Sequence, residues 1–183
     1  MKIVLATPLY PPDVAWPAPY TKELARRLSP AHTISIVTYG DLPEHIAGVA
    51  ITTISKRAPR LIRLMRYTGA LIYAARNADL IYAENGASVE LPLVITSFLS
   101  RTPIILHVGD ERAHKRASSQ LPLKSIYNAA RNSAKKVLTD SPMPRPEILP
   151  FKEYPTNEMA AYEASWHKHI EALEDLFTYA KQH

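Results

Sequence analysis

The sequence predicts an α/β domain: a doubly wound, Rossmann-like parallel sheet with helices on both faces, closed by a long amphipathic helix at the carboxyl end. Three observations predict it. Short apolar stretches recur along the first 140 residues, helical patterns separate most of them, and a long apolar stripe at helical spacing follows a proline-rich stretch. Strands that are apolar throughout, rather than alternating, fit a parallel sheet that is buried on both faces.

The elements of the predicted sheet follow one another in regular order. Strand-like composition marks six stretches, in chain order 2–6, 32–39, 49–55, 79–83, 103–108 and 135–139. Apolar residues three or four positions apart predict helices around Tyr20–Leu28, Leu61–Ile72, Leu91–Leu99 and Leu123–Ala130. Together these elements define a Rossmann-like domain over residues 1–141.

A proline-rich connector and a helix are expected after this domain. Residues 142–156 cannot hold a long helix, because proline lacks a backbone donor and restricts the residue before it. Residues 157–183 form the closing helix, with Thr156 or Asn157 as its N-cap. Its stripe comprises Met159, Tyr162, Trp166, Ile170, Leu173, Phe177 and Ala180. The stripe must be buried against the α/β domain or against a second chain, so a homodimer through this helix is one expectation.

Composition excludes several classes of site. The chain has no cysteine, which excludes a disulfide framework and a thiolate metal site and fits a cytoplasmic location. His167 and His169 are two positions apart, about 200° around a helix, so they cannot share a metal ion. We expect neither a metal nor a cofactor. The first strand begins at Lys2, which leaves no room for a signal peptide. The longest apolar runs fall short of the roughly 20 residues that span a membrane.

The chain is basic, with a net charge of +5 and a pI near 9.4. An anionic partner is therefore possible, but no nucleic-acid-binding motif or aromatic platform accompanies the charge, so nucleic acid is not expected. The basic residues gather in Arg57, Arg60, Arg63 and Arg66, spaced three apart beside Leu61 and Met65. This pattern favours contact with anionic lipid or a lipid-phosphate acceptor at the inner face of the membrane. The alternative is a solvated helix face.

Four segments resemble the amino-terminal domain of family 4-type glycosyltransferases, which are retaining enzymes of the GT-B fold. They are "MKIVLATPLYPPDV" with "PYTKELARRLS", "HTISIVTYGD", "ARNADLIYAENGASVELPLVITSFLSRTPIILHVGDE" and "ARNSAKKVLTDSP". The resemblance covers about residues 1–142. It implies a half-molecule that binds the acceptor, while a second Rossmann domain in such enzymes binds the nucleotide sugar.

The departures from this family pattern are specific. Ala15 and Trp16 stand where relatives have two glycines after the "PP-acidic" motif, so close approach of a phosphate is weakened. Histidines that follow two strands in relatives are replaced by Glu84, with Asn85 after it, and by Gly109, with Asp110 after it. Only about forty residues follow residue 142, too few for a donor-binding domain.

Two functions from different classes follow from this pattern. One is the acceptor-binding half of a split or degenerate glycosyl transfer system, working with a separate donor-binding chain and inactive alone. The other is a non-catalytic binding or scaffold protein derived from such a half. A lone half with activity of its own ranks last, because transfer needs a site that stabilises the departing diphosphate.

The candidate site residues lie where strands of the predicted sheet end. Asp110, in the loop "GDERAHKR", is the first candidate for a general base or sugar contact, and Glu84 is the second. Substrate contacts are expected from Asp13, Ala15, Trp16, Asn85, Ser88, Gly109 and Glu111. The alternatives are a solvated loop after Gly109 and a helix-capping role for Ser88.

Overall fold

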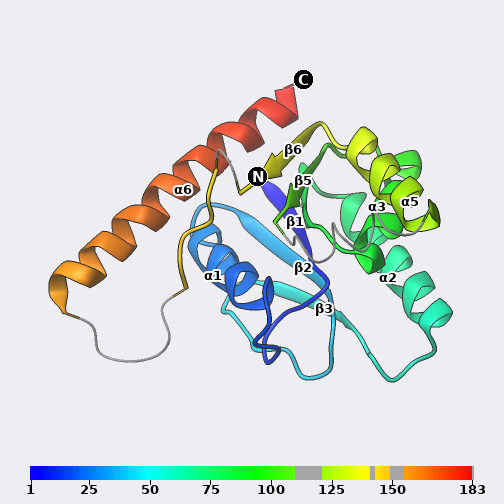
Figure 1. The fold of residues 1–183 in the computed structure, drawn as a ribbon, viewed down its shortest axis with the longest axis horizontal. Helices are drawn as coiled ribbons and strands as arrows, with labels where there is room; N and C mark the ends of the chain where they lie inside the picture. Colours follow the sequence, from blue (N-terminus) through cyan, green and yellow to red (C-terminus); the bar gives the residue numbers. More distant parts are fainter. Residues whose placement is uncertain (110–120, 141–142, 149–154, 183) are drawn as a thin grey trace.

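The computed structural model describes residues 1–109, 121–140, 143–148 and 155–182. Its centre is a six-stranded, all-parallel sheet in the order β3-β2-β1-β4-β5-β6 (Figure 1). The strands are β1 (Lys2–Ala6), β2 (Thr33–Tyr39), β3 (Ala50–Ile54), β4 (Leu80–Glu84), β5 (Ile104–Val108) and β6 (Lys136–Thr139). The doubly wound sheet predicted from the sequence is confirmed.

The strand order reverses direction at one place. The chain builds outward from β1 through β2 to β3, and then returns to place β4 on the other side of β1. Ala6 pairs with Val37 on one side and with Ala83 on the other, and Glu84 pairs with His107 of β5. The carboxyl ends of β1, β4 and β5 therefore meet at the switch point, which is where ligands bind in open α/β sheets.

Helices cover both faces of the sheet. They are α1 (Ala18–Leu28), α2 (Arg60–Ala75), α3 (Ala87–Leu99), α5 (Leu121–Ser133) and α6 (Thr156–Gln182). In Figure 1, α1 and α6 lie on one face, and α2, α3 and α5 lie on the other. Each face has its own apolar cluster, one joining α1 and α6 to the sheet and one joining the sheet to α2 and α3. Burial on both faces is what makes the strands apolar throughout.

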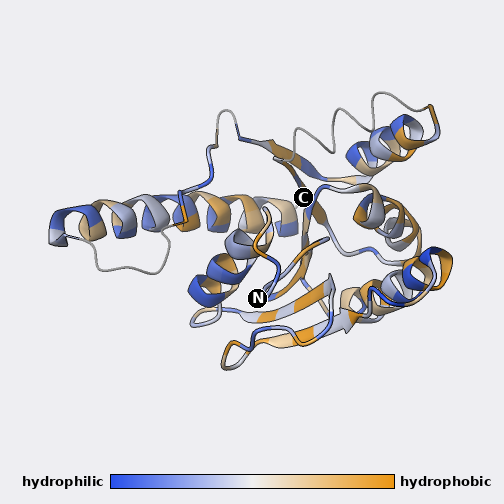
Figure 2. Cartoon of the chain, turned by 60° about the horizontal axis from the view of Figure 1, so that its bottom comes forward, coloured by the Kyte–Doolittle hydropathy of each residue, from blue (hydrophilic) through white to orange (hydrophobic). Residues whose placement is uncertain are grey.

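The closing helix packs on its own domain over only part of its length. Trp166, Leu173, Phe177 and Ala180 are buried against α1 and the sheet, and Ile170 is half-buried beside them. Met159 was predicted in the buried stripe, but 43% of its surface is exposed. The first turns of α6, which begins one residue before the predicted 157, extend beyond the sheet (Figure 2), so this end has no surface of the domain to cover it. A homodimer through α6 stays a prediction.

The basic stretch is only partly helical. Helix α2 begins at Arg60, so Arg57 lies in a turn ahead of it and does not share a helix face with the other arginines, as the spacing had predicted. Arg60 and Arg66 are exposed beside Leu61 and Met65. None of the helices in the described ranges is long and apolar enough to cross a membrane.

Candidate functional site

A buried arginine from the connector occupies the switch point of the sheet. The side chain of Arg145 is only 3% exposed. Its Nη1 lies 3.1 Å from Oε2 of Glu84, an ion pair rather than an aligned hydrogen bond. Its Nε lies 3.1 Å from Oδ1 of Asp140 and donates to Nε2 of His107 over 3.1 Å. Two carboxylates from the ends of β4 and β6 thus face one guanidinium.

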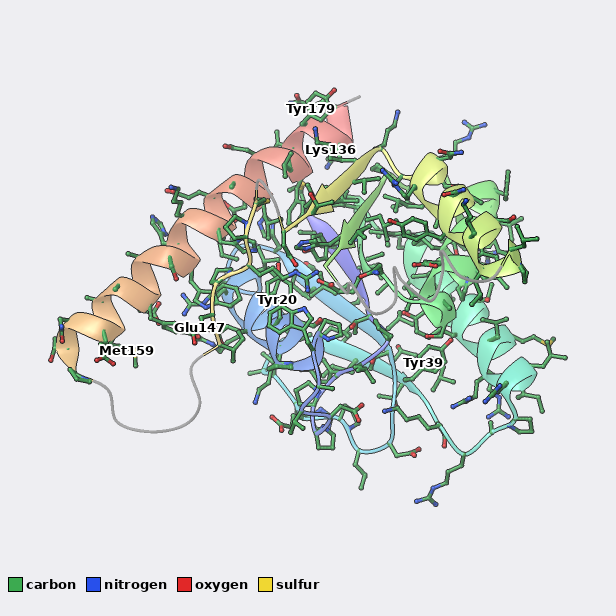
Figure 3. All side chains as sticks on the ribbon, in the orientation of Figure 1. Tyr20, Tyr39, Lys136, Glu147, Met159 and Tyr179 are labelled. Atoms are coloured by element: carbon green, nitrogen blue, oxygen red, sulfur yellow. The ribbon has the colours of Figure 1, made fainter. Side chains whose placement is uncertain are left out.

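Two aromatic rings and one glycine complete the surroundings of Arg145. The guanidinium carbon lies 5.0 Å from the ring centroids of both Trp16 and Tyr20, which is cation–π distance. A Cβ added to Gly109 would lie 1.7 Å from Nη2 of Arg145, so only glycine leaves room there. We call Trp16, Tyr20, Glu84, Gly109 and Asp140 the Arg145 cage. Tyr20 lies near the middle of the molecule beside the connector (Figure 3).

Gly109→Ala is expected to lower the free energy of unfolding by about 1–3 kcal/mol, because the added methyl group forces a buried, ion-paired guanidinium out of place. Urea denaturation measures this loss. The matched control is Gly69→Ala in α2, where nothing lies within 4 Å of the added Cβ. That change is expected to stabilise the helix by about 0.5–1 kcal/mol. Equal stabilities of the Gly109 variant and the parent would show that the cage does not hold Arg145 tightly.

A chain of hydrogen bonds leads from the cage to the closing helix. Because Arg145 Nε donates to Nε2 of His107, we assign the His107 proton to Nδ1, which then donates to the hydroxyl of Tyr82. The Tyr82 hydroxyl donates to that of Tyr20 over 3.1 Å, and Tyr20 donates to Nε2 of His169 over 2.8 Å. These hydrogen bonds connect Arg145 of the connector with β5, β4, α1 and α6 through buried side chains.

The two histidines of this hydrogen-bond network, His107 and His169, are neutral at pH 7. Burial, and then the positive charge of Arg145, lowers the pKa of His107 to about 2 and that of His169 to about 4. Burial also opposes the charge of Arg145 itself, but Glu84, Tyr82, Tyr20 and Asp140 together outweigh it, and the pKa of the guanidinium is raised. The cage therefore holds a permanent cation, and its neighbouring imidazoles add no second one.

His169→Gln is expected to flatten the loss of stability between pH 6.5 and about 4. The unfolded chain takes up a proton on His169 as the pH falls below its ordinary pKa of 6.5, whereas the folded chain does so only near pH 4. Each such histidine contributes a slope of about 1.4 kcal/mol per pH unit in this window. His167→Gln, an exposed position on the same helix, is the matched control for replacing a histidine of α6. Urea midpoints from pH 7 to 4 measure both slopes, and equal slopes would contradict the prediction.

The structure brings together some of the residues predicted from the sequence. Trp16, Glu84 and Gly109 belong to the cage. Asn85 is buried beside it: its backbone N–H donates to the carbonyl of His107 over 2.9 Å, and its Oδ1 accepts from the N–H of Gly109 over 3.2 Å. Asp110 and Glu111 lie outside the described residues, so their predicted roles stay predictions.

Other predicted site residues lie apart from the cage. Asp13 pairs with Lys56 at 2.6 Å and lines a separate hollow of ≈ 190 Å³ with Tyr10 and Tyr39. Ala15 is exposed, and its carbonyl accepts from the N–H of Ala18. Ser88 does not cap α3, because that helix begins at Ala87 with Gly86 at the N-cap position.

The arginines of the basic stretch contact groups that do not belong to the cage. Arg57 is 91% exposed and lies 3.9 Å from the carboxylate of Asp41. Arg63 donates to the backbone carbonyl of Lys56 over 3.2 Å. Arg60 and Arg66 face solvent at the start of α2. These contacts leave the predicted lipid surface exposed and separate from the crevice.

Sequence reasoning missed the centre of the site. Arg145 was placed in a surface connector, and Tyr20, Tyr82 and His107 occupy positions that look like ordinary core. The available signal was chemical: a histidine inside an otherwise apolar strand and an arginine between two prolines in "PMPRPE". Buried polar side chains require hydrogen-bond or ionic partners, so the histidine and the arginine each indicate a contact with a residue elsewhere in the chain. In the described part of the chain, no group of three or more His, Cys, Asp or Glu residues is arranged to hold a metal ion.

Comparison with known proteins identifies the fold. No protein-family model and no curated protein matches the sequence. Among solved structures, Anabaena Alr3699/HepE in complex with UDP and glucose is similar with a TM-score of 0.50 and 19% identity, over 75% of this chain and 37% of that chain. The complex of the same protein with UDP-glucose gives a TM-score of 0.50 over 36% of its length. An alpha-glucosyltransferase in complex with UDP and a 13-mer DNA is similar with a TM-score of 0.45 and 9% identity, over 76% of this chain.

At this identity the likeness concerns the fold. The chain spans little more than a third of the HepE chain that it matches. It therefore shares the α/β fold of one part of the HepE chain, in agreement with the fold that the sequence predicts. Membership of family 4 stays a prediction.

Proposed function

We propose that this chain is the acceptor-binding half of a split or degenerate glycosyl transfer system, with a separate chain supplying the donor-binding half. The observation that carries the proposal is the gathering of Trp16, Glu84, Asn85 and Gly109 at the switch point of the sheet. In a sugar site, an aromatic side chain contacts the face of the sugar ring, and carboxylate and amide groups bind the sugar hydroxyls. The fold shared with one part of HepE, a protein crystallised with UDP and glucose, supports the same assignment.

A non-catalytic binding or scaffold role is the second candidate, and a specific observation favours it. Glu84 is buried and paired with Arg145 of the same chain, so its carboxylate is engaged before any acceptor arrives. A general base must reach the proton that it removes. In the described arrangement Glu84 meets that condition only after Arg145 moves.

Ligand binding by the full chain tests these proposals. Calorimetry and thermal shift would be run with UDP-glucose, UDP, a polyprenyl phosphate and an inositol phosphate, on the parent chain, on Trp16→Ala and on Met159→Ala as an exposed control. An acceptor-binding half is expected to bind the polyprenyl phosphate or the inositol phosphate, to lose this binding in Trp16→Ala and to keep it in Met159→Ala. Saturable binding of UDP-glucose would instead indicate a donor site in this half. Silence on all four ligands would favour the scaffold.

We also propose that the start of α2 contacts anionic lipid. Arg57, Arg60 and Arg66 are exposed beside the apolar side chains of Leu61 and Met65. Each basic residue near an anionic surface contributes about 1 kcal/mol. Flotation with vesicles containing phosphatidylserine is expected to retain the parent chain, and replacing the three exposed arginines with glutamine should weaken retention about a hundredfold or more. Equal retention on neutral vesicles would contradict the proposal.

A further inference from the structure

We propose that the Arg145 cage is a binding site for a guanidinium group, which this chain fills with its own connector. When the connector leaves, the site becomes available to a guanidinium group from outside. This inference rests on the chemistry of the crevice and holds whether or not the chain takes part in glycosyl transfer.

The walls of the cage and its occupant come from different parts of the chain. Trp16 and Tyr20 lie before and within α1, Glu84 ends β4, and Gly109 and Asp140 follow β5 and β6. All five belong to the α/β domain or to loops anchored on its strands. Arg145 lies in the segment 143–148, which has no regular secondary structure. The walls are thus carried by the sheet and by α1 with the loop before it, and the occupant is carried by the connector.

The geometry of the cage suits a planar cation that two carboxylates and two aromatic rings surround. The two carboxylates approach different nitrogens of one guanidinium, Glu84 facing Nη1 and Asp140 facing Nε. The rings of Trp16 and Tyr20 lie at 5.0 Å from its central carbon. The selection rests on charge and stacking rather than on paired hydrogen bonds: a guanidinium is planar and stacks on aromatic faces, whereas an ammonium is a compact point charge. The cage should therefore discriminate against primary amines and against neutral isosteres.

The charges around the cage also favour a cation over a neutral ligand. Emptying the cage leaves the carboxylates of Glu84 and Asp140 beside the buried imidazole of His107 and removes the guanidinium that faces both. A neutral ligand in place of Arg145 would leave the carboxylate of Glu84 buried without its guanidinium partner. A cation restores the balance of charge. Asp140 and Trp16 are partly exposed, at 47% and 38%, so the cage has an edge that a ligand can reach.

A groove beside the connector gives the segment room to move. It lies between residues 143–147 of the connector and the exposed side of α6, with a volume of ≈ 740 Å³, and Tyr162, Ser165 and His169 line its helix side. The connector is therefore separated from α6 by open space along part of its length. The buried residues Trp166, Leu173, Phe177 and Ala180, which pack α6 on α1 and the sheet, do not line this groove, so displacement of Arg145 does not require removing α6 from the sheet.

The test is chemical replacement of the missing side chain. Arg145→Ala in the full chain is titrated with ethylguanidinium, and with ethylammonium and ethylurea as the point-charge and neutral controls, by calorimetry and thermal shift. Ethylguanidinium is expected to bind saturably and raise the Tm of the variant, at least about tenfold more tightly than either control. The parent chain and Arg57→Ala, which removes an exposed arginine, should show no such binding. Adding Trp16→Ala to Arg145→Ala should weaken binding about fivefold or more.

The source of the guanidinium is distinguished by a second probe, Nα-acetyl-argininamide. Binding of this probe as well as ethylguanidinium points to an arginine side chain of a partner protein, and binding of ethylguanidinium alone points to a small guanidino compound. Where Arg145→Ala does not fold alone, it is refolded from urea in the presence of each probe, and ethylguanidinium is expected to restore the far-UV circular dichroism of the parent chain. Failure of ethylguanidinium to bind or refold Arg145→Ala would overturn the proposal, and so would equal binding of ethylurea.

Discussion

Arg145→Met is expected to lower the free energy of unfolding by about 3–5 kcal/mol, because it leaves the buried carboxylate of Glu84 without its guanidinium partner. Breaking a buried ion pair costs more than removing both members, since the remaining charge keeps its desolvation penalty. The double variant with Glu84→Gln should therefore be more stable than Arg145→Met alone. Urea denaturation of the parent, the two single variants and the double variant measures the coupling.

The sign of the coupling energy shows whether Arg145 stabilises the fold through its charge or through packing. A double variant at least as unstable as the sum of the singles would mean that Arg145 stabilises the fold through packing on Trp16 and Tyr20 rather than through charge. Lys136→Met, which removes an exposed cation from β6, is the matched control and should change stability by less than about 0.5 kcal/mol.

Trp166→Ala is expected to cost about 3–5 kcal/mol, the usual range for removing a fully buried tryptophan. Its indole stacks on Tyr20 with ring centroids 5.8 Å apart, and the guanidinium carbon of Arg27 lies 5.0 Å from its centroid. Deleting the ring leaves a cavity between α1 and α6 and removes both contacts.

Met159→Ala tests whether the loss belongs to the docked part of α6. Met159 lies on the same helix, in the part that extends past the sheet (Figure 3), and its replacement should change stability by less than about 0.5 kcal/mol. Chemical denaturation followed by far-UV circular dichroism measures both variants. A loss of under about 1 kcal/mol for Trp166→Ala would contradict the docking of α6 on α1.

The fold could be predicted because its signals are local. Each strand of the sheet is a short apolar run, and burial on both faces demands that composition wherever the strand lies in the order. The stripe of α6 was equally visible, except at Met159, where the helix continues past the surface that it packs on. Helical periodicity reports which side of a helix is apolar, but it does not report where the neighbouring surface ends.

The site was predictable only in part, for a different reason. Glu84, Asn85 and Gly109 follow from a general rule, that ligands bind at the carboxyl ends of parallel strands. Arg145 does not, because its place depends on how a segment without regular structure folds back over the sheet. Tyr20 and Tyr82 each combine an apolar ring with a hydroxyl that takes part in the hydrogen-bond network. In the sequence, such a tyrosine looks the same as one that only packs in the core. Long-range pairing of this kind leaves no spacing pattern.

The docking of α6 on α1 has a consequence for biosynthesis. The apolar residues of α1, among them Tyr20, Leu24 and Leu28, are covered by a helix whose first buried residue comes about 140 positions later in the chain. At ribosomal rates of about 5–20 residues per second, that interval lasts roughly 7 to 28 s. During this interval α6 does not yet cover α1 and the face of the sheet beside it. Chaperones bind exposed apolar surface of this kind, which also promotes aggregation. Slowed translation between the codons of α1 and α6 should therefore lower the yield of folded protein more than slowed translation after Ala180.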